Sequence, residues 1–355
     1  MEVSGPDCAG REDTGITMNV SYSKIKPLFL QQSYMDAWED YRRALRKRSF
    51  PCWDVIVLTA SNEDQAAAYR KEIEYRLQNN LLPGKTKYAV LSDPGGKRVG
   101  SGGATLNVLR YLAETEGGRS AFEKKILVIH SGGDSKRVPQ YSVCGKLFSP
   151  VPRELPNGRA STLFDEFMIA TAGIPARMQG GMLVMSGDVL LLFNVLQIDL
   201  QYQGAAAISI KEPVAVGKEH GVFLNDGQGM VKRFLHKQSE EQLRELGAVN
   251  EQGMVDLDTG AVMLDTELLC ALFSLIAAGD RVEDEKFDRF VNDRARISFY
   301  GDFLYPLAKD STLEEYYLEA PEGSFCEELK DCRTDIWEAL HDFRMKVLCL
   351  SPAEF

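Results

Sequence analysis

Apolar runs alternate with amphipathic stretches along the first part of the chain. The runs suited to buried strands lie at residues 54–58, 88–91, 126–129 and 181–188. The stretches with helical spacing of apolar residues lie at residues 63–80, 106–116 and 163–172. Continuous apolar strands separated by helices are typical of a parallel sheet covered on both faces. We therefore expect an α/β fold that binds ligands at the carboxyl ends of its strands.

The pattern changes near residue 205. Shorter and more polar segments predict strands at residues 205–214, 220–226, 230–237 and 254–264. Helices follow from Leu268, an acidic helical stretch covers residues 310–342, and the apolar run 346–350 predicts a last strand. An apolar strand with an uncovered edge favours self-association, whereas a strand inside the sheet does not.

The N-terminal part predicts a loose polar tail over residues 1–20 and a helix over residues 34–48. Its apolar residues Tyr34, Trp38, Tyr41 and Leu45 recur at spacings of three and four. The basic residues between them indicate a solvated helix face rather than a nucleic-acid-binding arm. We expect residues 1–50 to form this tail and helix, and residues 51–355 to form the functional domain.

Composition narrows the possible partners and compartment. The formal net charge of −11 over 355 residues repels phosphate backbones, which excludes nucleic acid as an expected partner. Seven scattered cysteines without a C-x-x-C pair indicate reduced thiols rather than disulfides or a zinc site. No window approaches the ~20 apolar residues of a membrane span. A cytoplasmic protein without membrane contact is expected.

The loop that follows the strand at residues 126–129 carries the strongest chemical signal. It contains Gly132, Gly133, Arg137 and Lys146 within residues 130–152. A glycine pair lets backbone N–H groups approach phosphate oxygens, and nearby cations neutralise their charge. The predicted nucleotide-binding residues of this loop are Ser131, Gly132, Gly133, Asp134 and Ser135. The alternative is an ordinary surface turn whose cations are solvated.

A second glycine-rich stretch precedes the helix at residues 106–116. Its predicted nucleotide-binding residues are Gly100, Ser101, Gly102 and Gly103. We expect a helix N-terminus with free N–H groups, which suits a phosphate or a base. The glycine spacing does not match the dinucleotide fingerprint, and Asn79 stands where a P-loop ending in Gly84 requires glycine.

Asp188 ends the apolar strand at residues 181–188 and allows two interpretations. It could cap a following helix, because aspartate is a favoured N-cap residue. It could also bind Mg²⁺, which takes one or two carboxylates and completes its coordination with water and substrate phosphate.

Read in order, several segments resemble the L-fucokinase / GDP-fucose pyrophosphorylase family. They are GSGGAT, SGGDSKRVPQYSVCGK with FSPVP, SGDV, HGVF and LDTG. The resemblance runs from about Trp53 to the end of the chain. It implies a nucleotide-diphospho-sugar transferase fold of the Rossmann-like, GT-A type, with a mixed sheet and helices on both faces. GTP and a sugar phosphate would bind over the carboxyl edge of that sheet.

This resemblance also implies roles for single residues. Gly132 and Gly133 match a loop that cradles nucleotide phosphates, Arg137 and Lys146 match catalytic cations, and Asp188 matches the carboxylate that binds Mg²⁺.

The sugar-phosphate site implied by the resemblance comes from later segments. His220 and Gly221 match a sugar-binding strand edge, and Lys237 matches a lysine on the sugar phosphate. Asp258 and Thr259 match another sugar-facing strand, and a buried turn is the alternative there.

The chain also departs from the family pattern. Relatives continue into a left-handed β-helix and, when bifunctional, a sugar kinase, whose phosphate-loop pattern is not found here. The resemblance also implies a second metal ligand late in the fold, which we expect beyond Phe355, and Asp302 is interpreted as helical surface rather than as this ligand. Expected partners are therefore a separate C-terminal segment or kinase, and a second copy of the chain.

The expected reaction joins β-L-fucose 1-phosphate to GTP, giving GDP-L-fucose and pyrophosphate. The sugar-phosphate oxygen is already anionic, so positioning and charge stabilisation by Mg²⁺, Arg137 and Lys146 suffice. Two alternatives stay open. One is a non-catalytic domain that binds a nucleotide or sugar phosphate beside a kinase, and the other is a transferase for a different sugar phosphate.

Overall fold

A mixed β-sheet forms the centre of the protein in the computed structural model, which describes residues 22–131 and 145–350. Within these residues the sheet has nine strands in the order β13-β7-β10-β6-β3-β1-β2, with β8 paired to β10 and β9 paired to β8. The strands are β1 (Val55–Ala60), β2 (Lys87–Ser92), β3 (Lys125–His130), β6 (Gly181–Ser186), β7 (Ala205–Pro213), β8 (Gly221–Asn225), β9 (Val231–His236), β10 (Met254–Leu264) and β13 (Met345–Leu350).

Strand direction defines where a ligand can bind. Strands β2, β1, β3 and β6 run parallel, and β10 runs antiparallel between β6 and β7. Thr59 pairs with His130, and His130 pairs with Ser186, so the carboxyl ends of β1, β3 and β6 meet at one edge. The predicted mixed sheet of an α/β protein is confirmed.

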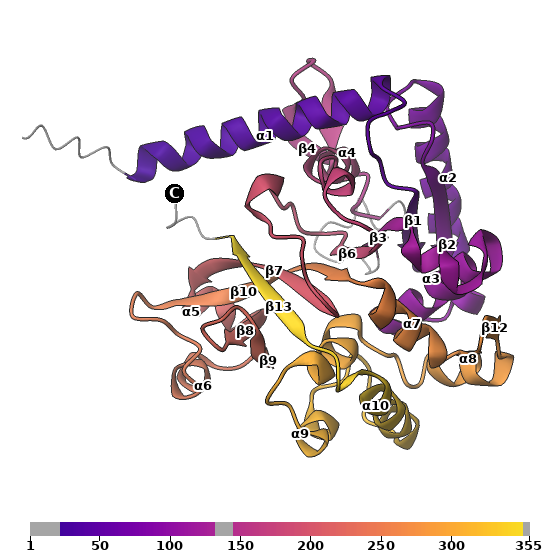
Figure 1. Cartoon of the computed structure of the whole chain (residues 1–355), viewed down its shortest axis with the longest axis vertical. Coiled ribbons are helices and arrows are strands. Elements are labelled where there is room, and N and C mark those ends of the chain that lie inside the picture. Colours follow the sequence, from indigo (N-terminus) through magenta and orange to yellow (C-terminus); the bar gives the residue numbers. More distant parts are fainter. Residues whose placement is uncertain (1–21, 132–144, 351–355) are drawn as a thin grey trace, which may run out of the picture.

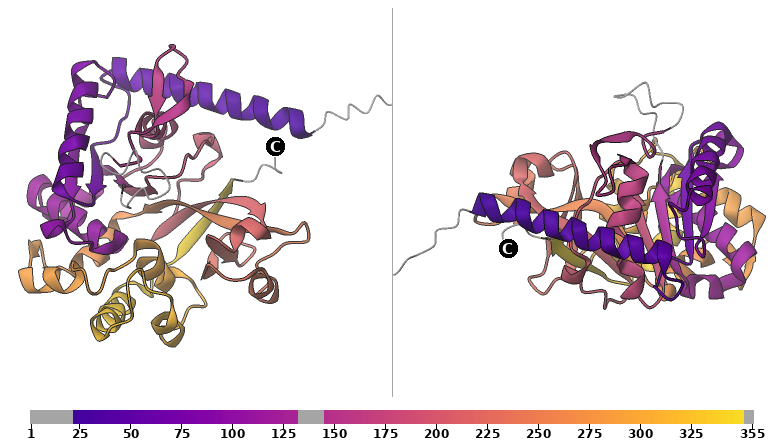
Figure 2. Two further views of the ribbon diagram at one scale, coloured as in Figure 1. Left: turned by 180° about the vertical axis from the view of Figure 1, so that it is seen from behind. Right: turned by 90° about the horizontal axis from the view of Figure 1, so that it is seen from above.

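Helices cover both faces of the sheet, and most of them were expected from the sequence. They are α1 (Tyr22–Arg46), α2 (Glu63–Gln78), α3 (Gly100–Glu116), α4 (Leu163–Ala170), α5 (Val214–Gly217), α6 (Glu240–Glu245), α7 (Thr266–Ser274), α8 (Asp284–Phe290), α9 (Leu313–Leu318) and α10 (Glu327–Leu340). Helices α1, α2 and α4 pack on one face, and α3, α7, α8 and α10 pack on the other (Figures 1 and 2).

Alternating side chains of the buried strands supply the two cores. Val57 and Val128 face α3 and α7, whereas Leu58 and Ile129 face α2 and α4. This is the period of two that a strand imposes, and it explains why strands buried on both sides read as continuous apolar runs.

Helix α1 begins earlier than the sequence predicted but buries the predicted stripe. Trp38 and Tyr41 are buried against the α4 side of the molecule, and Tyr34 and Leu45 pack around them. Arg42 pairs with Glu39 and Arg43 with Asp40 on the exposed side, as expected of a solvated helix face.

Helix α3 also begins earlier than expected, at Gly100 rather than near Leu106. Gly100 has a φ of 78°, and a side chain on Gly100 or Gly102 would collide with the backbone at Ile297. Glycines therefore allow the first turn of α3 to lie directly against another segment, a contact that apolar periodicity does not reveal.

Strand β13 is the terminal strand that the sequence predicted, and it lies at one end of the sheet. It runs parallel to β7, and Val347 N–H donates to Gly229 O at 2.7 Å on its other side. Val347 and Leu348 are buried, so this strand is largely covered by the described residues. Its place in the order excludes the alternative of a central strand.

Two short hairpins were not predicted from the sequence. They are β4 (Pro150–Glu154) with β5 (Ala160–Thr162), and β11 (Ala277–Ala278) with β12 (Arg281–Val282). Their strands have between two and five residues, which is too short for a clear alternation of apolar and polar positions.

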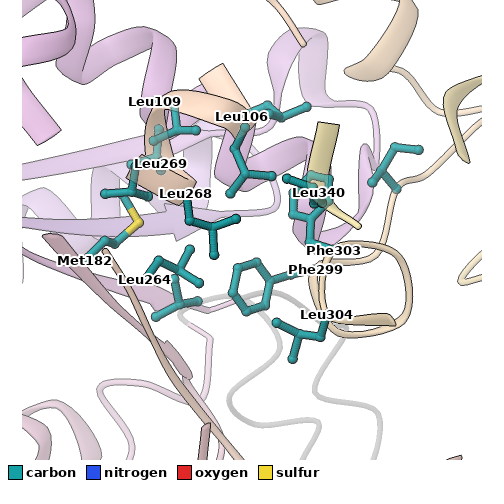
Figure 3. Close-up of a cluster of buried hydrophobic side chains, with 14 of the residues drawn as sticks. Leu106, Leu109, Met182, Leu264, Leu268, Leu269, Phe299, Phe303, Leu304 and Leu340 are labelled. Carbon is teal, nitrogen blue, oxygen red and sulfur yellow. The ribbon is translucent and has the colours of Figure 1, made fainter. Parts of the chain in front are cut away.

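A π-helical turn, Phe299–Phe303, joins the core to the edge of the sheet. Phe299 and Phe303 point into a cluster with Leu106, Leu264 and other apolar residues (Figure 3). The turn is thus held by a large buried surface. Such turns frequently occur at functional sites, because they displace side chains from regular helical positions.

The interpretation of Asp302, in this turn, as helical surface is wrong. Its side chain is 1% exposed, and Arg333 Nε donates to its Oδ1 at 2.8 Å. Ser298 N–H donates to the other carboxylate oxygen at 2.6 Å. A buried charge requires such partners, and Arg333 lies 31 residues away in sequence, so the sequence reading missed the pair.

Candidate functional site

A polar cleft of about 1150 Å³ opens beside the carboxyl end of β6. Strands β8, β9 and β10, the π-helical turn, the start of α3 and residues 318–322 contribute to its walls. The predicted site residues that line it are Ser101, Asp188, His220, Gly221, Lys237, Asp258 and Thr259. Segments that are more than 150 residues apart in sequence therefore meet in one cavity.

The remaining predicted residues divide into two groups. Lys146 contacts Asp188, and Ser131, Gly100, Gly102 and Gly103 lie nearby in the fold without lining the cleft. Gly132, Gly133, Asp134, Ser135 and Arg137 lie outside the described residues.

Asp188 follows β6 and points into the cleft. Gly187 N–H donates to His130 O at 2.8 Å, which ties this end of β6 to β3. Ser186 Oγ donates to Asp188 Oδ1 at 2.7 Å. No helix begins at Asp188, and the next short helical turn is capped by Asn194, so the helix-cap interpretation is wrong.

Lys146 brings a cation to the same carboxylate. Its Nζ lies 3.4 Å from Asp188 Oδ2, and the two side chains are 34% and 50% exposed. The chain after Lys146 is fixed, because Phe164 N–H donates to Leu147 O at 2.8 Å and Arg76 lies 4.9 Å above the Phe148 ring. A ligand in the cleft would therefore meet a cation with an anchored backbone.

Helix α2 holds both described ends of the segment between Ser131 and Gly145. The Tyr69 hydroxyl lies 2.5 Å from Ser131 Oγ. Gly145 has a φ of 70°, and a side chain there would collide with the same hydroxyl. Tyr69 thus brings the two ends together, and Gly145 is required for the close approach.

A buried histidine connects the edge strands to α3. Burial lowers the pKa of His130 to about 4, so the ring is neutral at physiological pH. Thr59 Oγ1 lies 3.2 Å from Nδ1, and Thr105 Oγ1 lies 3.0 Å from Nε2. Because Thr105 donates its own proton to Ser101 O at 2.9 Å, Nε2 carries the ring proton and Nδ1 accepts from Thr59. No role for His130 was predicted from the sequence.

The start of α3 differs from the expectation of free N–H groups. Gly102 and Gly103 N–H both donate to Ile297 O, at 2.7 and 3.3 Å. Ser101 N–H and Ser101 Oγ both donate to Glu322 Oε2 at 3.3 Å. These N–H groups are therefore engaged by protein groups, and nucleotide binding by this segment stays a prediction.

A bulge in β10 directs Asp258 into the cleft. The pairing with β7 shifts between Asp258 and Ala261, and Gly260, with a φ of 71°, donates its N–H to Asp258 Oδ1 at 2.8 Å. Burial raises the pKa of Asp258 to about 6, and this hydrogen bond opposes the shift. Thr259 Oγ1 instead donates to Ile208 O at 2.6 Å, so its hydroxyl supports the bulge.

Tyr300 from the π-helical turn lines the cleft together with Asp188 and Asp258. Its hydroxyl donates to Gly260 O at 2.9 Å. Burial raises the pKa of Tyr300 well above its ordinary value, and the charges of Asp258 and Asp188 raise it further. The phenol therefore stays protonated and can serve only as a neutral hydrogen-bonding group in the cleft.

The β8–β9 hairpin supplies the opposite wall. Lys237 has a φ of 52°, unusual for a residue with a side chain, and its N–H donates to His220 O at 3.0 Å. A side chain on Gly221 would collide with Phe234 and Asp258. His220 and Lys237 thus flank a narrow strand start that only glycine fits.

The sequence reading did not identify the wall formed by residues 318–322, which contributes two carboxylates, Glu319 and Glu322. Arg333 fixes this wall, since its Nη1 donates to Tyr316 O at 3.0 Å and to Glu319 O at 2.9 Å. Burial raises the pKa of both glutamates. These residues carried no motif that could have marked them.

The described residues contain no cluster of three or more histidine, cysteine, aspartate or glutamate side chains placed to hold a metal ion. A cation at Asp188 would therefore need ligands from a substrate or water. Over the same residues, no helix combines the length and apolarity needed to cross a membrane.

A mixed α/β sheet with a polar cleft at the carboxyl edge of its parallel strands is the arrangement in which α/β proteins typically bind small molecules. Comparison of the sequence with known families is more specific. A family model described as the fucose pyrophosphorylase domain matches residues 118–355. The chain belongs to this family.

Curated relatives agree with this assignment. Fucose-1-phosphate guanylyltransferases of Mus musculus and Homo sapiens are 29% and 28% identical, each over 85% of this chain. The bifunctional fucokinase/GDP-fucose pyrophosphorylase of Arabidopsis thaliana is 31% identical over 64% of this chain and 25% of its own length. The chain spans about half the length of the mouse and human relatives, 54% and 53%.

Proposed function

We propose that the chain carries the nucleotidyl-transfer site of a fucose-1-phosphate guanylyltransferase. It would join GTP and β-L-fucose 1-phosphate into GDP-L-fucose and release pyrophosphate. The family match and the names of the relatives support this reaction. The structural observation that carries the proposal is that Asp188, which Lys146 contacts, lines a cleft that His220 and Lys237 also line.

The finer fold assignment is part of the same proposal. We assign the sheet to the nucleotide-diphospho-sugar transferases of the Rossmann-like, GT-A type. Support comes from four parallel strands with the cleft beside their carboxyl ends, and from β10 inserted antiparallel between β6 and β7.

Transfer would proceed by in-line attack of the sugar-phosphate oxygen on the α-phosphorus of GTP. No residue needs to remove a proton, because the attacking oxygen is already anionic. Lys146 would neutralise charge on the nucleotide phosphates, and the anchored backbone after it keeps the cation in place. Lys237 would hold the sugar phosphate beside His220. Arg137 is assigned to the leaving pyrophosphate from the family resemblance.

The residues at Asp188 fit Mg²⁺. The carboxylate is half-exposed in the cleft, and magnesium usually takes one or two protein carboxylates with substrate phosphate and water. When bound there, Mg²⁺ would supply positive charge to the reacting phosphates. Ser186 orients Asp188 through its hydrogen bond to Oδ1 and leaves Oδ2 directed to Lys146.

The test is pyrophosphate release by the purified chain with each nucleoside triphosphate, Mg²⁺ and a panel of sugar 1-phosphates. The expected result is release with GTP and β-L-fucose 1-phosphate, and strong loss in Lys146→Ala. Binding of GTP without release in any mixture would instead indicate the non-catalytic domain. Release with another sugar 1-phosphate alone would refute the fucose assignment.

We place the reaction in the cytoplasm. The described cysteines, Cys52, Cys270, Cys326, Cys332 and Cys349, are free thiols, which supports a reducing compartment. A separate C-terminal segment or kinase, or a second copy of the chain, remains the proposed partner.

A further inference from the structure

We propose that Tyr69 of α2 is a positioning residue for the transfer reaction, because it holds the backbone on either side of Lys146 in place. This inference rests on the proposed function, in which Lys146 neutralises charge on the nucleotide phosphates. Tyr69 itself does not line the cleft and is 0% exposed, so it would act only through the residues that it contacts.

Helix α2 presents Tyr69 from a buried and capped element. The buried residues on its inner face recur at spacings of three and four, and they are Gln65, Tyr69, Ile73 and Arg76. The Asn62 side chain caps the helix by accepting from Gln65 N–H at 2.9 Å. A buried face on a capped helix keeps its side chains in place, so Tyr69 can fix the position of the chain that packs against it.

The Tyr69 hydroxyl joins the end of β3 to the backbone at Gly145. It forms a hydrogen bond of 2.5 Å with Ser131 Oγ, directly after the last residue of β3. Gly145 packs so closely on the same hydroxyl that a side chain there would collide with it and with Gln65 Nε2. Since Gly145 precedes Lys146, the backbone that carries the cation lies against a hydroxyl group bonded to the edge of the sheet.

The chain on the other side of Lys146 is held by the same helix. The centroid of the Phe148 ring lies 5.1 Å from the centroid of the Tyr69 ring and 4.9 Å from the guanidinium carbon of Arg76. Arg76 in turn donates to both carboxylate oxygens of Asp165 at 3.0 and 3.2 Å, which fixes the guanidinium against the Phe148 ring. Tyr69 therefore contacts the chain both before and after Lys146.

The backbone matters for Lys146 because its ion pair alone would hold it weakly. Lys146 Nζ lies 3.4 Å from Asp188 Oδ2, and the two side chains are partly exposed to solvent. An exposed ion pair contributes little to holding two side chains in one geometry. The placement of this cation therefore depends on the anchored chain around it. A displacement of about 1 Å at a reacting centre can lower the rate by up to about 10²-fold.

The experiment removes the hydroxyl in Tyr69→Phe, which deletes the contact with Ser131 and keeps the ring against Phe148. We expect kcat to fall by about 3- to 10-fold, the worth of one hydrogen bond. KM for β-L-fucose 1-phosphate should not change, because that substrate is assigned to His220 and Lys237 on the opposite wall. A general loosening of the cleft would instead raise this KM as well.

Tyr41→Phe is the matched control. Tyr41 is 4% exposed, does not line the cleft, and donates its hydroxyl proton to Leu81 O at 2.5 Å. Both substitutions remove one hydroxyl hydrogen bond from a buried tyrosine, so the two melting temperatures should fall by similar amounts. Tyr41→Phe should nevertheless keep the parental kcat.

A double-mutant cycle tests whether Tyr69 acts through Lys146. Lys146→Ala removes the cation, so adding Tyr69→Phe to it should not lower kcat further. If the two losses multiply, Tyr69 acts through another group and the proposal is wrong. Three other results would also overturn it: parental kcat in Tyr69→Phe, a raised KM for the sugar phosphate in that variant, or an equal loss of kcat in Tyr41→Phe.

The proposed function can fail separately from this inference. If the chain binds GTP but releases no pyrophosphate, the same cycle is measured with dissociation constants for GTP. Tyr69→Phe should then weaken GTP binding in the original chain and have no effect in the Lys146→Ala background, and equal weakening in both would overturn the positioning role. If neither GTP binding nor pyrophosphate release is detected, the proposed function and the inference that rests on it are both refuted.

Discussion

Replacing Arg333 with methionine should destabilise the protein strongly and weaken nucleotide binding as well. The change removes the only described cation hydrogen-bonded to Asp302 while keeping an unbranched side chain of similar length. It also leaves three backbone oxygens of residues 316, 317 and 319 without the guanidinium that now donates to them.

The magnitude follows from burial. Both side chains are at most 2% exposed, and breaking such a pair costs about 3–5 kcal/mol because an uncompensated charge remains. Unfolding entropy of about 2.1 cal/mol/K per residue gives roughly 0.75 kcal/mol/K for a chain of this size. A loss of about 4 kcal/mol should therefore lower the melting temperature by about 5 °C.

Thermal unfolding and urea unfolding measure this loss, and KM for GTP reports the state of the cleft wall. Arg289→Met is the control, because Arg289 pairs with Asp335 at 2.8 Å on the surface, where the side chains are 47% and 35% exposed. A surface pair contributes about 0–1 kcal/mol, so this variant should melt within about 1 °C of the original chain.

A second substitution tests the reason for the loss. Asp302→Asn in the Arg333→Met background removes the stranded charge but keeps an acceptor for Ser298 N–H. The double variant should regain much of the lost stability. If Arg333→Met melts like the control, or if the second substitution brings no recovery, the buried ion pair is not what holds this wall.

The remaining predictions concern the cleft. Lys146→Ala should lower kcat by about 10²–10³-fold without changing the melting temperature, because the lysine is a partly exposed cation; parental turnover would remove it from the mechanism. Asp188→Asn should raise the Mg²⁺ concentration needed for half-maximal rate, and an unchanged Mg²⁺ titration would contradict metal binding. Asp258→Asn should be more stable than the original chain at pH 7.5 but hardly so near pH 4. Its pKa is raised to about 6 in the folded protein, against about 3.9 unfolded, so the folded state alone binds the proton between these values and loses stability as pH rises through them. Melting temperatures at the two pH values check this, and equal differences at both would contradict it.

Much of the fold could be predicted because the buried strands are encoded locally. Runs such as residues 126–129 have no polar residue to place on a solvated face, which indicates a strand covered on both sides. The carboxyl ends of parallel strands then place Asp188 at the binding edge without further information. The position of the cleft was predictable for the same reason.

Other parts depend on tertiary contacts that no local pattern records. The glycines at residues 100–103 suggested a phosphate cradle, but two of their N–H groups meet Ile297 O. Asp302 was interpreted as a surface residue because charged residues are seldom buried. The ion pair with Arg333 compensates for the loss of hydration of its charge in the protein interior. Glu322 stands in a segment without periodicity, and only the fold brings it to the cleft beside Ser101.

The position of β10 has a consequence for how the protein acquires its site. Asp188 follows β6 and Asp258 lies in the neighbouring strand β10, but β10 leaves the ribosome after β7 and must enter between β6 and β7. Until that insertion occurs, the cleft lacks Asp258 and the bulge that orients it. A nascent or partly unfolded chain can therefore form the four parallel strands and still bind no ligand that needs both carboxylates. Ligand binding and the insertion of β10 are thermodynamically coupled, so a ligand held by both strands would also protect the pairing of β10 with β6 from opening.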